Sequence, residues 1–334
     1  MQSRPSDTRF TCDGSAKAPA AWRKPGLRRT AARLAPLALA QLALAQLALA
    51  PLALATIILA GPALAAPKGE RHNPACTTPA QAEQRAGAAV GLGARWSDAG
   101  ALILDDGRRL VPEGIVLPSR LAVDAALPRA SASAARTVLD TCLVHPGTGH
   151  TDRHGRLSGP AGLICPGRDD GTEQDLATAL LRAGAGYAQP AAAADGCLDQ
   201  RLAAENEARA AGRGIWAQPS AVAQAADEEA VAIRSGLFAV AEGRVLAAGG
   251  TRERIFLNFG ASWRQDFTAM IEREDFATIM GDSLDPAMLR GTLVRVRGVV
   301  RAEGGPAMAL RQAGQIALLS GREVRASRSR RDAK

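Results

Sequence analysis

An uncharged stretch near the N-terminus constrains this chain more than any other feature. No Asp, Glu, Lys or Arg occurs from Leu34 to Pro67, whereas eight basic and two acidic side chains precede it. A basic region, a long apolar region and a small-residue end at Ala63-Leu64-Ala65 are typical of a secretory signal. We expect residues 1–65 to be a signal peptide cleaved after Ala65, which would leave the protein periplasmic or secreted.

Two alternatives to cleavage stay open at this point. The apolar stretch is longer than the roughly 20 residues that span a bilayer, so it can also serve as an N-terminal anchor with residues 66 onward outside the cytoplasm. Met1 can also be a misassigned start. If the signal is cleaved, we expect no further contact with the membrane.

The charge balance argues against a basic nucleic-acid-binding domain. The whole chain has 41 basic and 33 acidic residues, a net charge of +8, but residues 66–321 hold 27 basic and 29 acidic ones. The excess lies in the signal segment and in residues 322–334, which we expect to be a disordered basic tail without a built site. Because the folded part is slightly acidic, nucleic-acid binding is expected to be weak.

Export would also make the cysteines informative. Cys12 lies in the signal segment, which leaves Cys76, Cys142, Cys165 and Cys197 in the mature chain. Their spacing is not a C-x-x-C metal pattern, and an oxidising compartment favours disulfides. Four cysteines allow three connectivities.

Hydrophobic periodicity and breaker residues divide the mature chain into two folded regions. After the signal segment, the expected parts are a leader (66–91), a first domain (92–218), an Ala/Gln-rich linker (219–234), a β-rich second domain (235–321) and the basic tail (322–334). In the first domain an Asp-Gly turn joins strands at 101–104 and 110–111, and a strand follows to Leu117. Helices are expected at 132–141, from a cap at Thr172 to a stop at Gly184, and at 198–211.

The second domain shows short strands around one helix, a pattern that suits a small Greek-key barrel. The expected strands are 244–247, 254–259, 267–271, 293–300 and 307–310, with the helix at 284–289. Val294 and Val296 alternate with Arg295 and Arg297, which predicts a half-buried strand with the valines inward and the arginines outward.

Two segments of the first domain resemble the staphylococcal nuclease-like (thermonuclease) family. Residues 202–216, Leu-Ala-Ala-Glu-Asn-Glu-Ala-Arg-Ala-Ala-Gly-Arg-Gly-Ile-Trp, look like its last helix, and Asp152-Arg-His-Gly-Arg156 is similar to its Asp-Arg-Tyr-Gly-Arg hairpin. The resemblance covers about residues 92–218 and implies a five-stranded OB-fold barrel with three helices. The fold class we expect is therefore mainly β with helices (α+β), an OB-fold barrel followed by a second small β-rich, OB-like domain. That second domain is similar to one that accompanies thermonuclease-like domains in some bacterial proteins.

The resemblance also implies where the family's catalytic residues would stand. Its metal-binding Asp falls on Gly100, its first Arg on Val111, its second metal-binding Asp on Val116 and its general-base Glu on Ser119, while the hairpin Arg is retained as Arg156. Phosphodiester hydrolysis by this route needs oxygen ligands for a Ca²⁺-type ion, a carboxylate base and guanidinium donors. We therefore expect an inactive member that needs no metal or cofactor and acts as a binding or scaffold module toward an unknown envelope ligand or protein.

Two other functions stay open. One is a Ca²⁺-dependent nuclease whose carboxylates come from other positions, namely Asp98, Asp105, Asp106 or Glu113. The other is a purely structural periplasmic module.

The hairpin around the Asp152–Arg156 turn suggests one disulfide. Cys142 and Cys165 are equidistant from the point between Arg153 and His154, and opposite residues of a hairpin lie within reach of a disulfide. Cys76 would then pair with Cys197 and tie the leader to the last helix. Free cysteines or another pairing stay open, because an insertion within 158–171 would break the symmetry.

The remaining candidates have simpler readings. His145, His150, His154 and Asp152 could suggest a zinc site, but a solvated loop is the favoured interpretation. Candidate nucleic-acid or ligand contacts are Arg153, Arg254, Trp263 and Arg264, which place basic groups near aromatic ones. The phenylalanines beside them, Phe256, Phe259 and Phe267, are expected in the core because the chain has only six.

Overall fold

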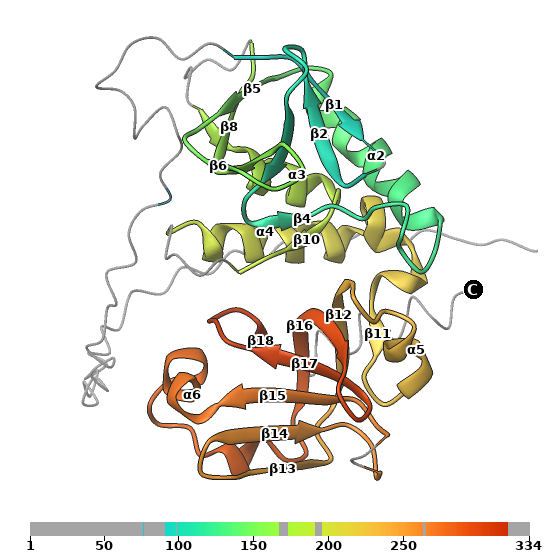
Figure 1. Ribbon diagram of the computed structural model, residues 1–334, viewed down its shortest axis with the longest axis vertical. Helices are drawn as coiled ribbons and strands as arrows, with labels where there is room; N and C mark the ends of the chain where they lie inside the picture. Colours follow the sequence, from blue (N-terminus) through green and yellow to red (C-terminus); the bar gives the residue numbers. More distant parts are fainter. Residues whose placement is uncertain are drawn as a thin grey trace, which may run out of the picture. The chain divides into compact units, whose positions relative to one another are not determined.

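The computed structural model describes residues 76, 91–97, 99–166, 173–190, 196–262 and 265–319 (Figure 1). The expected signal peptide, most of the leader and the tail lie outside these residues, as do Asp98, Thr172, Trp263 and Arg264. In the part of the chain that is described, no helix has the length and apolar character needed to cross a membrane. We call residues 91–218 the first module and residues 235–319 the second module.

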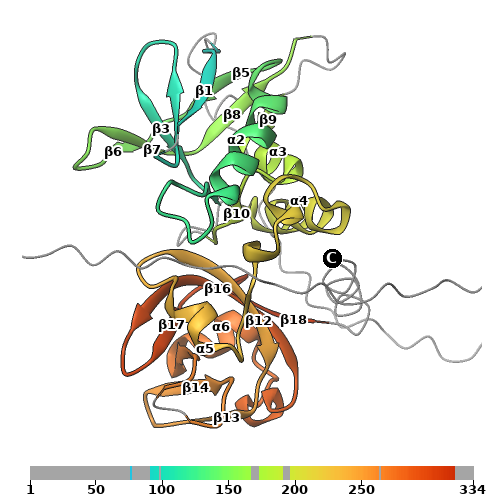
Figure 2. The same ribbon diagram turned by 90° about the vertical axis from the view of Figure 1, so that its right-hand side faces the viewer.

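The first module combines short strands with three α-helices. Its strands are β1 (Ala94–Ser97), β2 (Ala101–Leu104), β3 (Arg109–Pro112), β4 (Ile115–Val116), β5 (Leu143–Pro146), β6 (His150–Thr151), β7 (Arg156–Gly159), β8 (Ala161–Ile164), β9 (Gln174–Asp175) and β10 (Tyr187–Ala188). Its helices are α2 (Ala126–Leu139), α3 (Leu176–Ala183) and α4 (Leu198–Ala211), followed by a 3₁₀ turn at Gly214–Ala217. Figure 2 shows the three helices along one side of the strands.

The strands of the first module pair in three sheets, one of five strands, one of three strands, and one in which β4 pairs with β10. β1, β2 and β3 pair antiparallel in order, β3 pairs parallel with β7, and β6 pairs antiparallel with β7. β8 continues from β7 and pairs antiparallel with β5. Leu92 and Val144 exchange two backbone hydrogen bonds of 2.8 and 2.7 Å, so the pairing returns from β5 to the start of β1. The apolar core inside this ring comprises inward residues such as Leu102, Leu110 and Leu163, closed by Leu176 and Leu180 of α3.

The hairpin register explains the disulfide Cys142–Cys165, which the structure contains with its two Cα atoms 4.2 Å apart. β5 and β8 pair Leu143 with Ile164, so positions 142 and 165 are the next opposite pair. Nearer the turn, His150 pairs with Ser158, a register shifted by one residue, so the first strand carries one extra residue, as in a β-bulge. The predicted pair is confirmed, although the turn is centred on His154. The second predicted disulfide, Cys76–Cys197, is also present.

Capping interactions set the helix bounds and correct two of the predictions. The Asp175 carboxylate accepts the backbone N–H of Thr178 at 2.8 Å, so Asp175, and not Thr172, caps α3. Gly184 ends α3 in the left-handed conformation, as expected, with φ of 81°. Helix α2 begins at Ala126, six residues before the expected start; its N-cap, Ala125, makes no side-chain hydrogen bond, and the preceding Asp124 carboxylate accepts the Ala126 N–H at 2.7 Å. Helix α4 has the predicted bounds.

The second module has seven strands and one α-helix, preceded by a structured connection. Its elements are β12 (Phe238–Arg244), β13 (Ala247–Gly250), β14 (Arg254–Asn258), β15 (Thr268–Glu272), α6 (Arg273–Met280), a 3₁₀ turn (Pro286–Leu289), β16 (Leu293–Ala302), β17 (Pro306–Leu310) and β18 (Ile316–Leu318). The expected linker 219–234 contains a 3₁₀ turn (Pro219–Ala221), β11 (Ala223–Gln224) and α5 (Glu228–Ala232). The predicted helix at 284–289 is only the 3₁₀ turn, and the α-helix lies earlier, at α6.

The strand order of the second module repeats that of the first. β13 pairs with β14, β14 with β15, β15 in parallel with β17, and β17 with β16. β16 pairs antiparallel with β12, which leads through Val245 into β13, so this pairing is also closed. In each module one helix separates, along the chain, two strands of the ring. Helix α2 lies between β3 and β5, and helix α6 lies between β15 and β16. Phe259 and Phe267 stack in this core with ring centroids 5.1 Å apart, as predicted, while Phe256 is half-buried.

The two modules share a buried network of ion pairs between α4 and the sheet of the second module. Arg297 of β16 donates to both carboxylate oxygens of Glu205 on α4, at 2.8 Å each. Glu242 of β12 accepts from Arg295 at 2.7 Å and from Arg209 of α4 at 2.6 Å. Arg295 and Arg297 do point away from the barrel core, but they are buried, so the prediction that they face solvent is wrong.

Candidate functional site

The structure brings together two positions where the resemblance places catalytic carboxylates. A Cβ atom added at Gly100 would lie 3.5 Å from the Ser119 Cβ and 3.1 Å from the Leu117 carbonyl oxygen. Gly100 has a φ of 74°, which disfavours any residue with a side chain. Among the described residues, no three His, Cys, Asp or Glu side chains gather closely enough to hold a metal ion. The described residues around Gly100 and Ser119 therefore offer no set of side-chain ligands for a metal ion.

Arg156 lies on the same face of the β3–β7 pair as Val111, because Arg156 pairs with Arg109 and Ser158 pairs with Val111. Its guanidinium Nε donates to Asp152 at 2.7 Å, and its backbone N–H donates to the same carboxylate at 3.0 Å. These contacts lower the pKa of Asp152 to about 2, the Arg156 backbone N–H being the largest cause and the guanidinium a further one. Arg156 therefore holds the hairpin turn.

This pairing gives a testable titration. We expect the Asp152 carboxyl carbon to titrate near pH 2 by NMR, and Arg156→Gln to raise that pKa only part of the way to 3.8, because the backbone donor stays. Since the folded-state pKa is lowered, the contribution of Asp152 to stability is present above pH 4 and is lost as the pH falls toward 2. A wild-type Asp152 that titrates at 3.8 would contradict the ion pair.

The histidines form no shared site among the described residues. His145 is buried on β5, with its Nδ1 2.7 Å from Glu173 Oε1, whereas His150 and His154 are exposed. The Arg153 Nε donates to the His154 ring at 3.1 Å on the exposed turn. The solvated-loop interpretation fits His154 on the exposed turn, but it is wrong for His145, which is buried on β5 beside Glu173, and the zinc interpretation gains no support from these positions.

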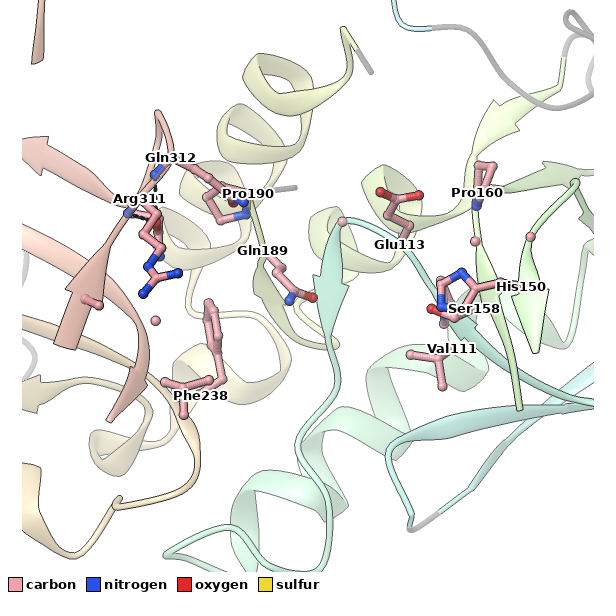
Figure 3. Close-up of a pocket in the computed structure, with 18 of the residues that line it drawn as sticks. Val111, Glu113, His150, Ser158, Pro160, Gln189, Pro190, Phe238, Arg311 and Gln312 are labelled. Atoms are coloured by element: carbon pink, nitrogen blue, oxygen red, sulfur yellow. Dashed lines mark hydrogen bonds between the residues drawn. The ribbon is translucent and has the colours of Figure 1, made fainter. Parts of the chain in front are cut away.

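A cleft of about 730 Å³ lies between strands of the two modules (Figure 3). Its walls include Glu113, His150, Ser158 and Gln189 of the first module and Phe238, Val299 and Arg311 of the second. Figure 3 shows Arg311 and Phe238 on one side, Glu113 and His150 on the other, and Gln189 between them. Of these residues, the sequence predicted only Glu113, as an alternative carboxylate, and His150, as a zinc candidate. No local motif marks the cleft, because it exists only where two modules meet.

Gln315 fixes the wall of this cleft after β17. Its side-chain oxygen accepts the backbone N–H groups of Arg311 and Gln312, at 2.7 and 2.9 Å. Its amide nitrogen donates to the carbonyl of Arg297, at 3.2 Å. The loop that carries Arg311 is thus tied to the same strand that joins the two modules. These three hydrogen bonds hold this part of the cleft wall in place.

The cleft carries one acidic and one basic side chain, together with amides, two hydroxyls, an imidazole and apolar groups. Glu113 and Arg311 balance each other in charge, and Pro112, Pro160 and Pro190 form apolar wall segments. A balanced, partly apolar surface favours a chain with its own hydrogen-bonding backbone over a polyanion. Of the predicted ligand contacts, Arg153 and Arg254 do not line it, and Arg254 pairs with Glu272 at 3.0 Å.

Comparisons with known proteins add little. No protein family matches the sequence, and no curated protein matches it. Among solved structures, an aspartyl tRNA synthetase from Entamoeba histolytica is 14% identical over 29% of this chain and 21% of its own, with a TM-score of 0.22. The OBody AM1L10 bound to hen egg-white lysozyme is 18% identical over 26% of this chain and 83% of its own, with a TM-score of 0.19. This chain thus spans about a fifth of the synthetase, and likenesses this low carry no argument.

Proposed function

We propose that this protein is a non-catalytic binding or scaffold module of the cell envelope, in which two OB-fold barrels present one ligand cleft. The OB-fold assignment is supported by the strand order. When the five strands of each ring are counted along the chain, the third and the fifth pair in parallel, β3 with β7 and β15 with β17. Barrels of this type bind chain-like ligands in many proteins. Export is supported by the uncharged segment before residue 68 and by the two disulfides.

The missing carboxylates support a non-catalytic role. Gly100 and Ser119 lie together and offer one hydroxyl group between them, whereas a hard divalent ion needs several oxygen ligands. The retained Arg156 is engaged by Asp152. Function follows the site and not the fold, so a nuclease-like barrel without its ligands is expected to bind and not to cleave.

The cleft is the observation that carries the binding function. Its size suits several residues of an extended peptide, and its balanced charges and amide groups suit a peptide backbone. We propose a peptide segment of an envelope protein as the ligand.

Selection from a displayed library of random 12-residue peptides tests this proposal. We expect wild-type protein to enrich a peptide family that binds with micromolar affinity. Val299→Glu, which places a charge on a cleft residue that is 47% exposed, is expected to weaken binding at least tenfold. Leu246→Glu is the matched control, because Leu246 is 46% exposed in the same module but outside the cleft. Equal binding by both variants would place the ligand elsewhere.

Incubation with DNA and RNA separates this function from the nuclease alternative. With Ca²⁺ or Mg²⁺, single- or double-stranded substrates should remain intact. Cleavage that is abolished by EDTA and by Arg156→Ala would overturn the non-catalytic assignment. A protein that neither cleaves nucleic acid nor enriches any peptide would favour the purely structural role.

A further inference from the structure

Arg234 is a buried cation without a carboxylate partner among the described residues. Its side chain, in a residue only 8% exposed, donates to the carbonyl oxygens of Ala230 and Ser220. The other buried arginines, Arg201, Arg295 and Arg297, each pair with a carboxylate. Asp227 attracts the Arg234 guanidinium electrostatically, but the two side chains lie too far apart to form an ion pair. Because an uncompensated buried charge is costly, this position favours an anionic ligand.

Tyr187 adds a second unused group. This residue is 6% exposed, and within the described part of the chain its hydroxyl makes no hydrogen bond and is not sealed off from solvent. Its ring packs edge-on against Trp216, with centroids 5.5 Å apart, which fixes its direction. Burial raises the pKa of Tyr187 above its ordinary value, so the hydroxyl keeps its proton at neutral pH and can donate it.

Both side chains line the same small cavity, of about 80 Å³, distinct from the cleft. The rest of its wall is mostly apolar and includes Val116, Pro118, Val123, Leu127 and Phe238. Ser220 also lines the cavity, but its hydroxyl already donates to Asp124 at 2.6 Å. One water needs roughly 10–15 Å³ of such space, so the cavity has room for a handful of heavy atoms and excludes a nucleotide.

We infer that this cavity binds a small carboxylate with a short apolar substituent, with Arg234 and Tyr187 as donors to the carboxylate oxygens. A guanidinium and a phenolic hydroxyl are both donors, which suits an acceptor-only group. The apolar wall suits a short alkyl group and opposes the strongly hydrated, doubly charged phosphate or sulfate. The same chemistry is offered by a free short-chain acid and by the C-terminus of a peptide that ends in a small apolar residue.

Calorimetric titration of the purified protein with sodium propionate tests the site, with sodium chloride at equal ionic strength as the reference. We expect saturable binding and a rise in Tm with propionate concentration, since the ligand binds only the folded state. Tyr187→Phe removes one oxygen atom and should weaken binding about tenfold, as expected for a hydrogen bond to a charged group. Arg234→Gln should abolish binding. Arg254→Gln, at an exposed arginine, is the control and should bind as wild type does.

Further ligands and variants distinguish the source of the carboxylate and cover the case of a variant that does not fold. N-acetyl-glycyl-valine and its C-terminal amide distinguish the two sources: binding of propionate alone indicates a free acid, and binding of the peptide acid but not the amide indicates a chain terminus. If Arg234→Gln does not fold, Tyr187→Phe and the cavity-filling Val123→Phe carry the test. The inference is overturned if propionate and the peptide acid do not bind, if phosphate binds more tightly than either, or if these variants bind as wild type does.

Discussion

Replacing Glu205 with Ala is expected to lower the free energy of unfolding by about 3–5 kcal/mol, the cost of breaking a buried ion pair from one side. Glu205 is fully buried on α4, where its carboxylate accepts two N–H donors of Arg297 at 2.8 Å and the Ala188 backbone N–H at 2.5 Å. The substitution would leave the Arg297 guanidinium in the interior with only the Ala188 carbonyl as acceptor, at 3.1 Å. Urea denaturation measures the loss.

The same helix supplies a matched control. Glu207 lies two residues farther on and pairs with Arg182 and Arg213, but its side chain is 51% exposed. Glu207→Ala is therefore expected to change stability little, because solvent screens such pairs. The double variant Glu205→Leu/Arg297→Met should recover most of the stability lost in Glu205→Ala, since removal of both charges leaves none unpaired. An equal effect of Glu205→Ala and Glu207→Ala would show that the Glu205–Arg297 pair does not hold α4 against the second module.

The ion pairs between α4 and the second module also show what the sequence could not reveal. Val294 and Val296 are buried in the barrel core as their alternation predicted, but Arg295 and Arg297 meet the carboxylates of Glu242 and Glu205. Period-two alternation indicates which residues leave the barrel core and says nothing about what covers them. Glu205 and Arg209 lie within the helical motif that suggested the thermonuclease-like family, yet here they contact the second module. No local pattern predicts the contact of Glu205 with Arg297, 92 positions farther along the chain.

Sequence signals predicted correctly those features that depend on nearby residues alone, such as the ends of helices. Gly184 and Gly212 end α3 and α4 in the left-handed conformation that their positions predicted. Helix α6 was missed because Arg273–Met280 begins directly at the end of β15, with no intervening turn and no side-chain cap hydrogen bond to mark its start. Gly100 and Ser119, two positions on which the resemblance places catalytic carboxylates, lie close together in the structure. The cleft and the Arg234 cavity depend on contacts between modules and could not be predicted as such, although Val111 lines the cleft and Val116 and Ser119 line the cavity.

Removing the two disulfides one at a time is expected to destabilise the protein by different amounts. The Cys76–Cys197 bond joins residues 121 positions apart, and the Cys142–Cys165 bond joins residues 23 apart. Because the entropy removed from the unfolded chain grows with loop length, the double Ser variants should lose about 4–5 and about 3 kcal/mol respectively. Urea denaturation of both variants beside wild type, without reductant, measures the difference.

The order of these two losses is the informative result. Cys142 and Cys165 already face each other across the β5–β8 pairing, so the hairpin keeps its register without the bond. Cys197 directly precedes α4, whose Glu205 and Arg209 hold the second module, and Cys76 lies outside every strand. Loss of the Cys76–Cys197 bond should therefore also increase hydrogen exchange in α4, whereas loss of Cys142–Cys165 should leave α4 protected. A larger loss for Cys142–Cys165 would mean that the bond holds the hairpin itself, and that the β5–β8 pairing is too weak to close the first module alone.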